Sequence, residues 1–270
     1  MDAEMKPALE ECMREAGAIL MKSFGHIHAR DINTKPDESV VTKADMDSEK
    51  AIVEIIRSKF PKHNIIAEET GFLDNKSEYT WVVDPLDGTS NFAAGIPWFG
   101  VLIAVMKKAE PVLAGAYLPF YNQAYTAEKG RGAFMNGSKI SASTEKELRA
   151  VLFSYCLDPL KDSEKIAMES RLFSLLANSI RNLRTTNSAV DECYVADGRL
   201  GGCINLMTKI WDIAAPWLII REAGGAFTMA DGSEVDFSFN GKNYMRNFPI
   251  ATAGKNLHPK IIRMIKEAEK

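Results

Sequence analysis

Residues 81–92 read Trp81-Val82-Val83-Asp84-Pro85-Leu86-Asp87-Gly88-Thr89-Ser90-Asn91-Phe92, and this stretch decides the fold. A short apolar strand runs into two aspartates three positions apart, and a Gly-Thr pair follows. Pro85 lies between the aspartates and prevents a regular ladder or helix, so we expect a turn there. Both carboxylates would then converge beyond the end of the strand, where open α/β sheets usually place ligands.

The backbone of this stretch offers further polar groups. The carbonyl of Leu86 lies between the two aspartates in the chain and can point toward the same place. Gly88 and Thr89 would open the next helix, so their N–H groups could hold a phosphate at the positive end of the helix dipole. The stretch therefore indicates a place for a metal ion and a phosphate side by side.

Two further acidic positions border apolar segments. Glu68 follows Ile65-Ile66-Ala67, and Asp212 begins a helix that is otherwise apolar. Each acid alone has an ordinary explanation, as a helix cap, an Asx-turn or a solvated strand end. Together they supply hard oxygen ligands, which Mg²⁺ prefers. Carboxylates gathered in one place repel one another unless cations lie among them. A joint metal site is therefore the better interpretation.

The rest of the chain alternates between helical and strand-like patterns. Apolar residues at three- and four-residue steps predict helices near 5–24, 45–59, 163–179, 188–197, 211–223 and 258–269. Apolar runs predict strands near 65–67, 81–83, 99–106, 111–118, 123–127, 151–155, 182–185, 201–205, 226–229 and 249–252. Asn136-Gly137 predicts a tight hairpin turn, and the polar, Pro-interrupted residues 29–43 predict a mobile loop. This order of elements favours layered sheets and helices of the mixed α/β class.

Composition narrows the class of protein. The 270 residues have a net charge of -3 and no basic stripe, so we expect no binding to nucleic acid. Four cysteines without a CxxC pair predict buried, reduced thiols. No signal core and no apolar run of about 20 residues is present, which predicts a cytoplasmic protein without a membrane segment. Because no linker or repeat divides the chain, we expect a single domain, with halves of about 1–145 and 146–270 sharing one core.

The chain resembles the inositol monophosphatase family along nearly its whole length. The resemblance rests on Ala67-Glu68-Glu69, on residues 81–92 and on Trp211-Asp212-Ile213-Ala214-Ala215, with weaker support from residues 41–45, 134–137 and 221–225. It implies a five-layered αβαβα sandwich. It also implies hydrolysis of a phosphate monoester that depends on two to three Mg²⁺ ions, commonly inhibited by lithium, and a homodimer.

The same resemblance implies roles for individual residues. The implied metal ligands are the side chains of Glu68, Asp84, Asp87 and Asp212 and the backbone carbonyl of Leu86. The implied catalytic residues are Asp45 and Thr89, which position and deprotonate the attacking water, together with Glu68. The implied substrate contacts are Gly88, Thr89, Ser188, Asn205 and Asp212. Lys35 resembles a lysine of the family's mobile active-site loop.

The substrate side departs from the family's pattern. The family usually has Gly-Ser/Thr-Ala-Ala where this chain has Thr186-Asn187-Ser188-Ala189. Inositol-hydrolysing members typically have a glutamate where this chain has Asn205. An amide donates as well as accepts a hydrogen bond and has no charge, and sites that bind a hydroxyl discriminate strongly when a partner changes. This chain therefore either acts on a different alcohol from the inositol-hydrolysing members or binds the same alcohol through different contacts.

We expect a small phosphorylated metabolite as the substrate, either inositol-1-phosphate or a related sugar or polyol phosphate. The alternatives are fructose-1,6-bisphosphate, a 3'(2'),5'-bisphosphate nucleotide or NADP, and histidinol phosphate. A regulatory protein that binds the transcription or translation machinery is the alternative from a different class. Competent residues fill every metal and water position, which favours the enzyme because a pure binding protein does not need them.

Overall fold

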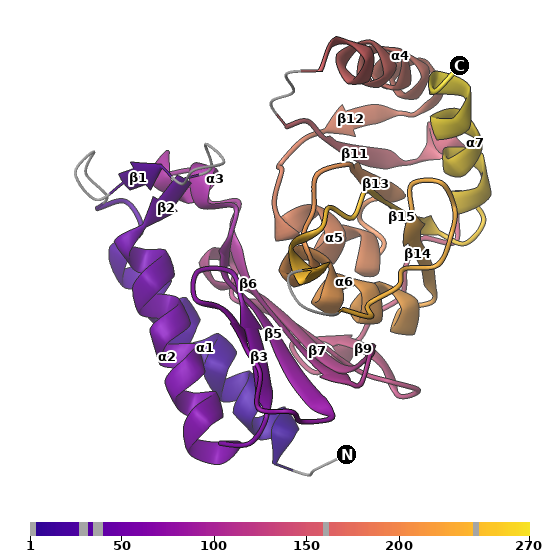
Figure 1. Cartoon of the computed structure of the whole chain (residues 1–270). Coiled ribbons are helices and arrows are strands. Elements are labelled where there is room, and N and C mark those ends of the chain that lie inside the picture. The colour runs from indigo at the N-terminus through magenta and orange to yellow at the C-terminus, as the bar shows by residue number, and fades with distance from the viewer. Residues whose placement is uncertain (1–3, 27–31, 35–39, 159–161, 240–242) are drawn as a thin grey trace.

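The computed structural model describes residues 4–26, 32–34, 40–158, 162–239 and 243–270. They form five stacked layers (Figure 1). Helices α1 (Met5–Ser23) and α2 (Lys43–Lys59) cover one face of an eight-stranded sheet, and α5 (Ala189–Ala196) and α6 (Ile210–Glu222) cover the other. A five-stranded sheet follows, and α4 (Ser163–Ser179) and α7 (His258–Ala268) lie on its outer face. The expected αβαβα sandwich is confirmed.

The eight-stranded sheet has the order β10-β9-β8-β7-β6-β5-β3-β4 and is antiparallel except where β3 lies parallel to β5. Its strands are β3 (Asn64–Ala67), β4 (Gly71–Leu73), β5 (Tyr79–Asp87), β6 (Gly100–Lys107), β7 (Glu110–Leu118), β8 (Gln123–Glu128), β9 (Gly132–Met135) and β10 (Ser138–Lys139). Strands β9 and β10 form the hairpin predicted from Asn136-Gly137. Both turn residues have positive φ angles, 49° and 79°, as a two-residue turn of this kind requires.

The five-stranded sheet has the order β12-β11-β13-β15-β14, and β11 lies parallel to both of its neighbours. Its strands are β11 (Leu152–Cys156), β12 (Asn182–Arg184), β13 (Gly202–Asn205), β14 (Gly225–Met229) and β15 (Ile250–Gly254). The short helix α3 (Thr89–Ala93) follows β5 directly. None of the described helices is long and apolar enough to cross a membrane.

Strand β5 is buried on both faces, which explains its continuous apolar run. Trp81 and Val83 pack toward α1 and α2, whereas Val82 packs into the layer of α5 and α6. That middle layer forms one cluster with contributions from both halves of the chain, for example Leu102 and Ile219. The four cysteines are buried and free, as predicted.

The turn predicted at Pro85 was wrong, because β5 continues to Asp87. Asp84 lies opposite Leu102 and Asp87 lies opposite Gly100, so β5 has one residue more than β6 between these pairs. This is a β-bulge, which tolerates a proline because the ladder is already interrupted. Residues three apart in a regular strand point to opposite faces. The extra residue cancels one alternation and lets both aspartates face the same side.

The loop predicted over residues 29–43 was also wrong in part. Ile32–Thr34 forms β1 and Val40–Thr42 forms β2, and the two strands pair antiparallel. The β-branched Val40 and Val41 favour such pairing despite the polar surroundings. Lys35 lies outside the described residues.

Candidate active site

Three aspartates meet where β5 ends and α6 begins. Asp84 and Asp87 lie at the bulge of β5, and Asp212 lies in the first turn of α6. Each places a carboxylate oxygen within 4.8 Å of the others. Glu68, which follows β3, and Leu86 line the same cavity of about 240 Å³. The structure therefore brings together all five residues that the sequence predicts as metal ligands.

Burial and mutual repulsion make these acids weak. Burial, followed by the charges of Glu68, Asp87 and Asp212, raises the pKa of Asp84 well above its usual value. Burial also raises the pKa of Asp87 to about 7, against an N–H from Ala189 that lowers it. The pKa of Asp212 is raised by burial and by the charges of Asp87 and Glu68. A cation among them would remove this repulsion.

The chemistry of the cluster fits a hard divalent cation. No Lys or Arg among the described residues forms an ion pair with Asp84, Asp87 or Asp212, so their charge is not balanced by protein cations. Two of the acids are held by backbone amides. Asp84 Oδ1 accepts from Leu86 N at 3.0 Å, and Asp212 Oδ2 accepts from Lys209 N at 2.6 Å. The remaining carboxylate oxygens and the Leu86 carbonyl are the donors that Mg²⁺ selects.

One face of α2 positions the site from behind. Asp45, Ser48 and Glu49 lie three and four residues apart, so all three point the same way, and all are buried. Ser48 Oγ donates to Pro85 O at 2.9 Å and fixes the bulge. Glu49 accepts from Glu69 N and Thr70 N, both at 2.8 Å, and so holds the turn that begins at Glu68. Sequence analysis missed Glu49, although a glutamate on the apolar face of a helix signals a buried partner.

Asp45 and Thr89 form a connected pair. Asp45 Oδ2 accepts from the Thr42 backbone and hydroxyl at 2.8 and 2.6 Å, and Thr89 Oγ1 lies 2.9 Å from Asp45 Oδ1. The same Thr89 hydroxyl lies 2.9 Å from Leu86 O, so its single proton has two acceptors. Burial raises the pKa of Asp45, opposed by the hydrogen bonds from Thr42 and Thr89. Thr89 thus lies between the buried acid and the cavity that it lines.

Gly88 is closely packed beside this pair, at a position where only a glycine fits. Its φ is +84°, and an added Cβ would lie 2.6 Å from Trp98 O and 2.9 Å from the Cβ of Ser188. Glycine is the residue that adopts this conformation without strain. Ser188 caps α5, and the N–H of Ala189 donates to Asp87 Oδ1. The start of α5 is therefore fixed against the bulge of β5.

The remaining wall of the cavity is polar. Ser188 and Asn205, the two residues expected to contact a substrate from this side, line it, and Asn205 Oδ1 accepts from Met207 N at 3.0 Å. Asp158 and Glu192 also line it, and sequence analysis missed both. Asp158 follows strand β11, and the pattern of an acid after an apolar strand, which pointed to Glu68, would have found it. Asn187 Nδ2 donates to Asp158 Oδ1 at 3.1 Å.

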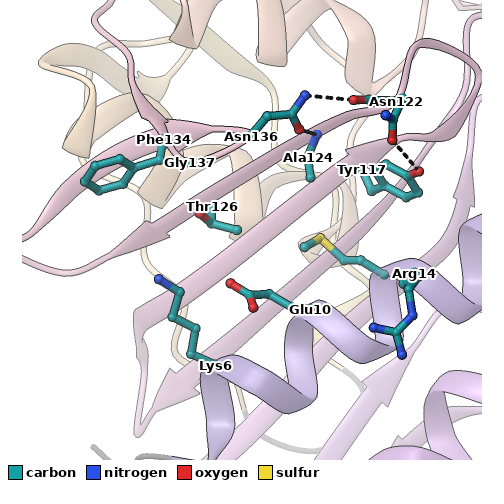
Figure 2. A pocket seen from close by; sticks show the side chains of 11 residues that line it. Lys6, Glu10, Arg14, Tyr117, Asn122, Ala124, Thr126, Phe134, Asn136 and Gly137 are labelled. Atoms are coloured by element: carbon teal, nitrogen blue, oxygen red, sulfur yellow. Dashed lines mark hydrogen bonds between the residues drawn. The ribbon is translucent and has the colours of Figure 1, made fainter.

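A larger cavity of about 520 Å³ lies elsewhere, between α1 and the sheet strands β7, β8 and β9 (Figure 2). Lys6, Glu10 and Arg14 of α1 border it. The side-chain amide of Asn136 is already hydrogen-bonded there, because its Oδ1 accepts from Ala124 N and its Nδ2 donates to Asn122 O, both at 2.9 Å. The carboxylate cluster lies outside this cavity, so we place the chemistry in the smaller one.

Comparisons with known proteins support the same interpretation of the site. The model of the inositol monophosphatase family matches residues 1–270. The chain is 34% identical over 216 residues to a fructose-1,6-bisphosphatase/inositol-1-monophosphatase of Aquifex aeolicus, covering 79% of this chain and 81% of that protein. It is 36% identical over 234 residues to Nus factor SuhB of Escherichia coli strain K12, covering 86% and 84%.

Solved structures agree with these sequences. Extragenic suppressor protein suhB of Bartonella henselae aligns with a TM-score of 0.90 at 27% identity, covering 98% of this chain and 99% of that one. An IMPase of Thermotoga maritima aligns with a TM-score of 0.86 at 28% identity, covering 99% and 98%. Similarity of this extent covers both sheets and the layers between them.

Proposed function

This chain belongs to the inositol monophosphatase family, and we propose that it is a Mg²⁺-dependent hydrolase of phosphate monoesters on small polyol-like molecules. The single observation behind the proposal is the convergence of Asp84, Asp87 and Asp212 beside the hydrogen-bonded pair of Thr89 and Asp45. Family membership supports a metal-dependent phosphatase. The magnesium requirement, the type of ester and the roles of the residues are part of the proposal.

In this proposal, Glu68, Asp84, Asp87, Asp212 and the Leu86 carbonyl hold two to three Mg²⁺ ions. Bound Mg²⁺ supplies positive charge for the phosphoryl group and lowers the pKa of water. Phosphoryl transfer asks mainly for positioning and charge neutralisation. Asp84, Asp87 and Asp212, none of which forms an ion pair with a Lys or Arg among the described residues, suit that task.

Thr89 and Asp45 handle the proton of the attacking water. Thr89 Oγ1 donates to Asp45 Oδ1, which leaves its lone pairs free to accept a hydrogen bond from water. As the water attacks, its proton moves toward Thr89 Oγ1 while the Thr89 proton moves toward Asp45. The raised pKa of Asp45 favours its acting as the acceptor.

The substrate lies against Gly88, Thr89, Ser188 and Asn205 in this proposal. Gly88 and Thr89 line the cavity where α3 begins, so the backbone there is the part of the chain that a phosphate would meet. Asn205 faces the alcohol and offers a neutral amide, whose Oδ1 already accepts from Met207 N. We therefore propose inositol-1-phosphate or a related sugar or polyol phosphate. Fructose-1,6-bisphosphate is the second candidate substrate, because the Aquifex aeolicus relative is named for both activities.

A substrate screen tests the proposal. Purified full-length protein is incubated with inositol-1-phosphate, fructose-1,6-bisphosphate, 3'-phosphoadenosine 5'-phosphate, NADP and histidinol phosphate, and released inorganic phosphate is measured. We expect release that requires Mg²⁺ and falls on addition of Li⁺. No release from any of these esters in Mg²⁺, by a protein that is folded by circular dichroism, would contradict the proposal.

The names of several relatives favour a second candidate. Proteins 33–36% identical to this chain are called Nus factor SuhB, which points to a role with the transcription machinery. We propose this as an added binding role rather than a replacement, because every predicted metal and water position has a competent residue. Co-purification of RNA polymerase with Asp84→Asn as well as with wild type would separate binding from hydrolysis.

Three further expectations stay proposals: action as a single domain, a homodimer and a cytoplasmic location. The shared middle cluster supports the single domain. Exposed Trp98 and Phe120, which are 37% and 47% accessible, support an interface on that side of the molecule. Elution from gel filtration at about twice 29.9 kDa would support the dimer, and elution as a monomer at micromolar concentration would contradict it.

A further inference from the structure

Two buried cysteines lie together on neighbouring strands behind the active-site cavity. Cys156 ends β11 and Cys203 lies in β13, and their Sγ atoms are 3.9 Å apart. Both face the middle layer, where the first turn of α5 places Asp191 and Glu192. The Cys156 thiol contacts Asp191 Oδ2 at 3.5 Å, and the Cys203 thiol contacts Glu192 Oε1 at 3.8 Å.

These distances match a tetrahedral zinc site. Two sulfur atoms each about 2.3 Å from a tetrahedral zinc ion lie about 3.8 Å apart, and a sulfur and an oxygen lie about 3.5 Å apart. Cys156, Asp191 and Cys203 each offer a ligand atom, all within 4.8 Å of one another. Glu192 Oε1 lies 3.8 Å from the Cys203 sulfur but does not belong to this set of mutually close ligand atoms.

Asp191 gives an independent indication of a ligand. Its side chain is completely buried, and its two oxygens differ: Oδ2 accepts from Asn187 N at 3.1 Å and contacts the Cys156 thiol, whereas Oδ1 has no hydrogen bond of normal geometry among the described residues. Neither Asp191 nor Glu192 forms an ion pair with a Lys or Arg in the part of the chain that the structure describes. A buried carboxylate oxygen without a partner costs free energy unless a cation or donor reaches it.

A disulfide fits the same cysteines less well. Cys203 pairs with Ser154 in the parallel ladder, and Cys156 pairs with Asn205, so the two cysteines are two positions out of register. Residues in such a diagonal relation have Cα atoms about 7–8 Å apart, beyond the usual limit of about 6.8 Å for a disulfide. The sulfur atoms would have to approach to about 2 Å, which the strands oppose.

We propose that Cys156, Cys203 and Asp191 form a binding site for a thiophilic divalent cation of the Zn²⁺ type. The site is distinct from the all-oxygen cluster, because sulfur ligands select Zn²⁺ over Mg²⁺. Glu192 also lines the active-site cavity, which gives an ion a route from solvent. Each bound ion displaces the two thiol protons, which pass to solvent as the two metal–sulfur bonds form.

Cobalt is the probe that distinguishes the two sites. Full-length protein, freed of metal with a chelator and reduced, is titrated with Co²⁺ in saturating Mg²⁺ without oxygen. A thiolate-to-cobalt charge-transfer band in the near ultraviolet reports sulfur ligation, whereas Co²⁺ bound by carboxylates has none. We expect one equivalent of Co²⁺ to develop this band, to be displaced by Zn²⁺, and to release about two protons at neutral pH.

Variants locate the ligands. Cys156→Ser and Cys203→Ser should each weaken Co²⁺ binding more than about tenfold, and Asp191→Asn should weaken it while keeping the band. Cys193→Ser is the matched control. Cys193 is a buried cysteine of α5, the helix that carries Asp191, but it lies outside the ligand set, so this variant should bind Co²⁺ like wild type.

Wild-type protein alone can overturn the proposal, whether or not the variants fold. Absence of the band in wild type would do so, and so would a loss of two hydrogens in the intact mass with no metal bound. A band that survives in the Cys156→Ser/Cys203→Ser protein, or that Cys193→Ser weakens equally, would also contradict it. A zinc-dependent rise in the melting temperature of wild type but not of the double variant would support it.

Discussion

Thr89 Oγ1 lies 2.9 Å from Asp45 Oδ1, although 44 positions separate the two residues in the chain. The contact joins the first turn of α3, which follows the bulge of β5, to the first turn of α2. Asp45 is held in turn by the backbone and hydroxyl of Thr42, so its carboxylate cannot rotate freely. The pair is therefore positioned by the fold before any substrate arrives.

Removal of the Thr89 hydroxyl should slow turnover selectively. Thr89→Val keeps the shape of the side chain but cannot pass a proton to Asp45. We expect kcat for the best substrate to fall about 100-fold or more, the size of a general-base contribution, with KM little changed. Thr89→Ser keeps the hydroxyl and is the control, which should stay within about tenfold of wild type. Near-normal turnover by Thr89→Val would remove the pair from the mechanism.

Asp84→Asn should abolish turnover without unfolding the protein. The substitution removes a buried charge that repels Glu68, Asp87 and Asp212, so the metal-free variant should be at least as stable as metal-free wild type. Mg²⁺ should raise the melting temperature of wild type but not of the variant. Calorimetry with and without Mg²⁺ and phosphate release measure the two effects. Turnover near the wild-type rate would contradict the assignment of Asp84.

Much of the fold follows from the sequence because burial imposes periodicity. Strand β5 packs against helices on both faces, and its sequence is a continuous apolar run. Helix α7 buries only one side, and its apolar residues recur at helical spacing. The convergence of Asp212 with Asp84 could be predicted because polar groups collect at the ends of apolar elements. These predictions need only local pattern and the rule that ligands bind at such ends.

The rest depends on contacts between distant segments. The bulge at Pro85 is visible only in its register against β6, so the sequence could indicate an interruption but not its kind. Glu49 acts through the backbone amides of Glu69 and Thr70, twenty residues away, which no local pattern indicates. The meeting of Cys156 with Cys203 requires knowing which strands pair, because two helices and a strand separate β11 from β13 in the chain.

Stability without metal should fall as pH rises. The pKa of Asp87 is about 7 in the folded protein against 3.8 for an ordinary aspartate, so the folded state binds the proton more tightly. The protonated Asp87 therefore stabilises the folded state; this contribution is complete below about pH 3.8 and is lost as pH rises toward 7. Without metal, we expect the melting temperature to fall by a few degrees between pH 5 and pH 7.5.

Saturating Mg²⁺ should remove this fall, because the cation replaces the proton among the carboxylates. The gain in melting temperature on adding Mg²⁺ should therefore be larger at pH 7.5 than at pH 5. Asp87→Asn is the control and should show a weaker pH dependence without metal. A melting temperature without metal that rises steadily over this range would contradict the electrostatic account of the cluster.

Asn205→Glu should move specificity toward inositol-1-phosphate. Asn205 lines the cavity and has no charge, whereas a carboxylate there would accept hydrogen bonds from ring hydroxyls. We expect kcat/KM for inositol-1-phosphate relative to fructose-1,6-bisphosphate to rise about tenfold or more. Asn205→Gln adds the same length without charge and should leave the ratio within about threefold. Equal ratios in all three proteins would place the choice of alcohol elsewhere in the cavity.

Gly88→Ala should be far more harmful than a matched change at Gly95. Both glycines have positive φ angles, +84° and +74°, so alanine costs about 1–2 kcal/mol at either position. Only at Gly88 would the new Cβ also lie 2.6 Å from Trp98 O, whereas nothing lies within 4 Å at Gly95. Overpacking adds about 1–3 kcal/mol, so urea unfolding should show a total loss of about 2–5 kcal/mol for Gly88→Ala. Equal losses at the two positions would show that backbone strain, not close packing against Trp98 and Ser188, requires a glycine beside the metal cluster.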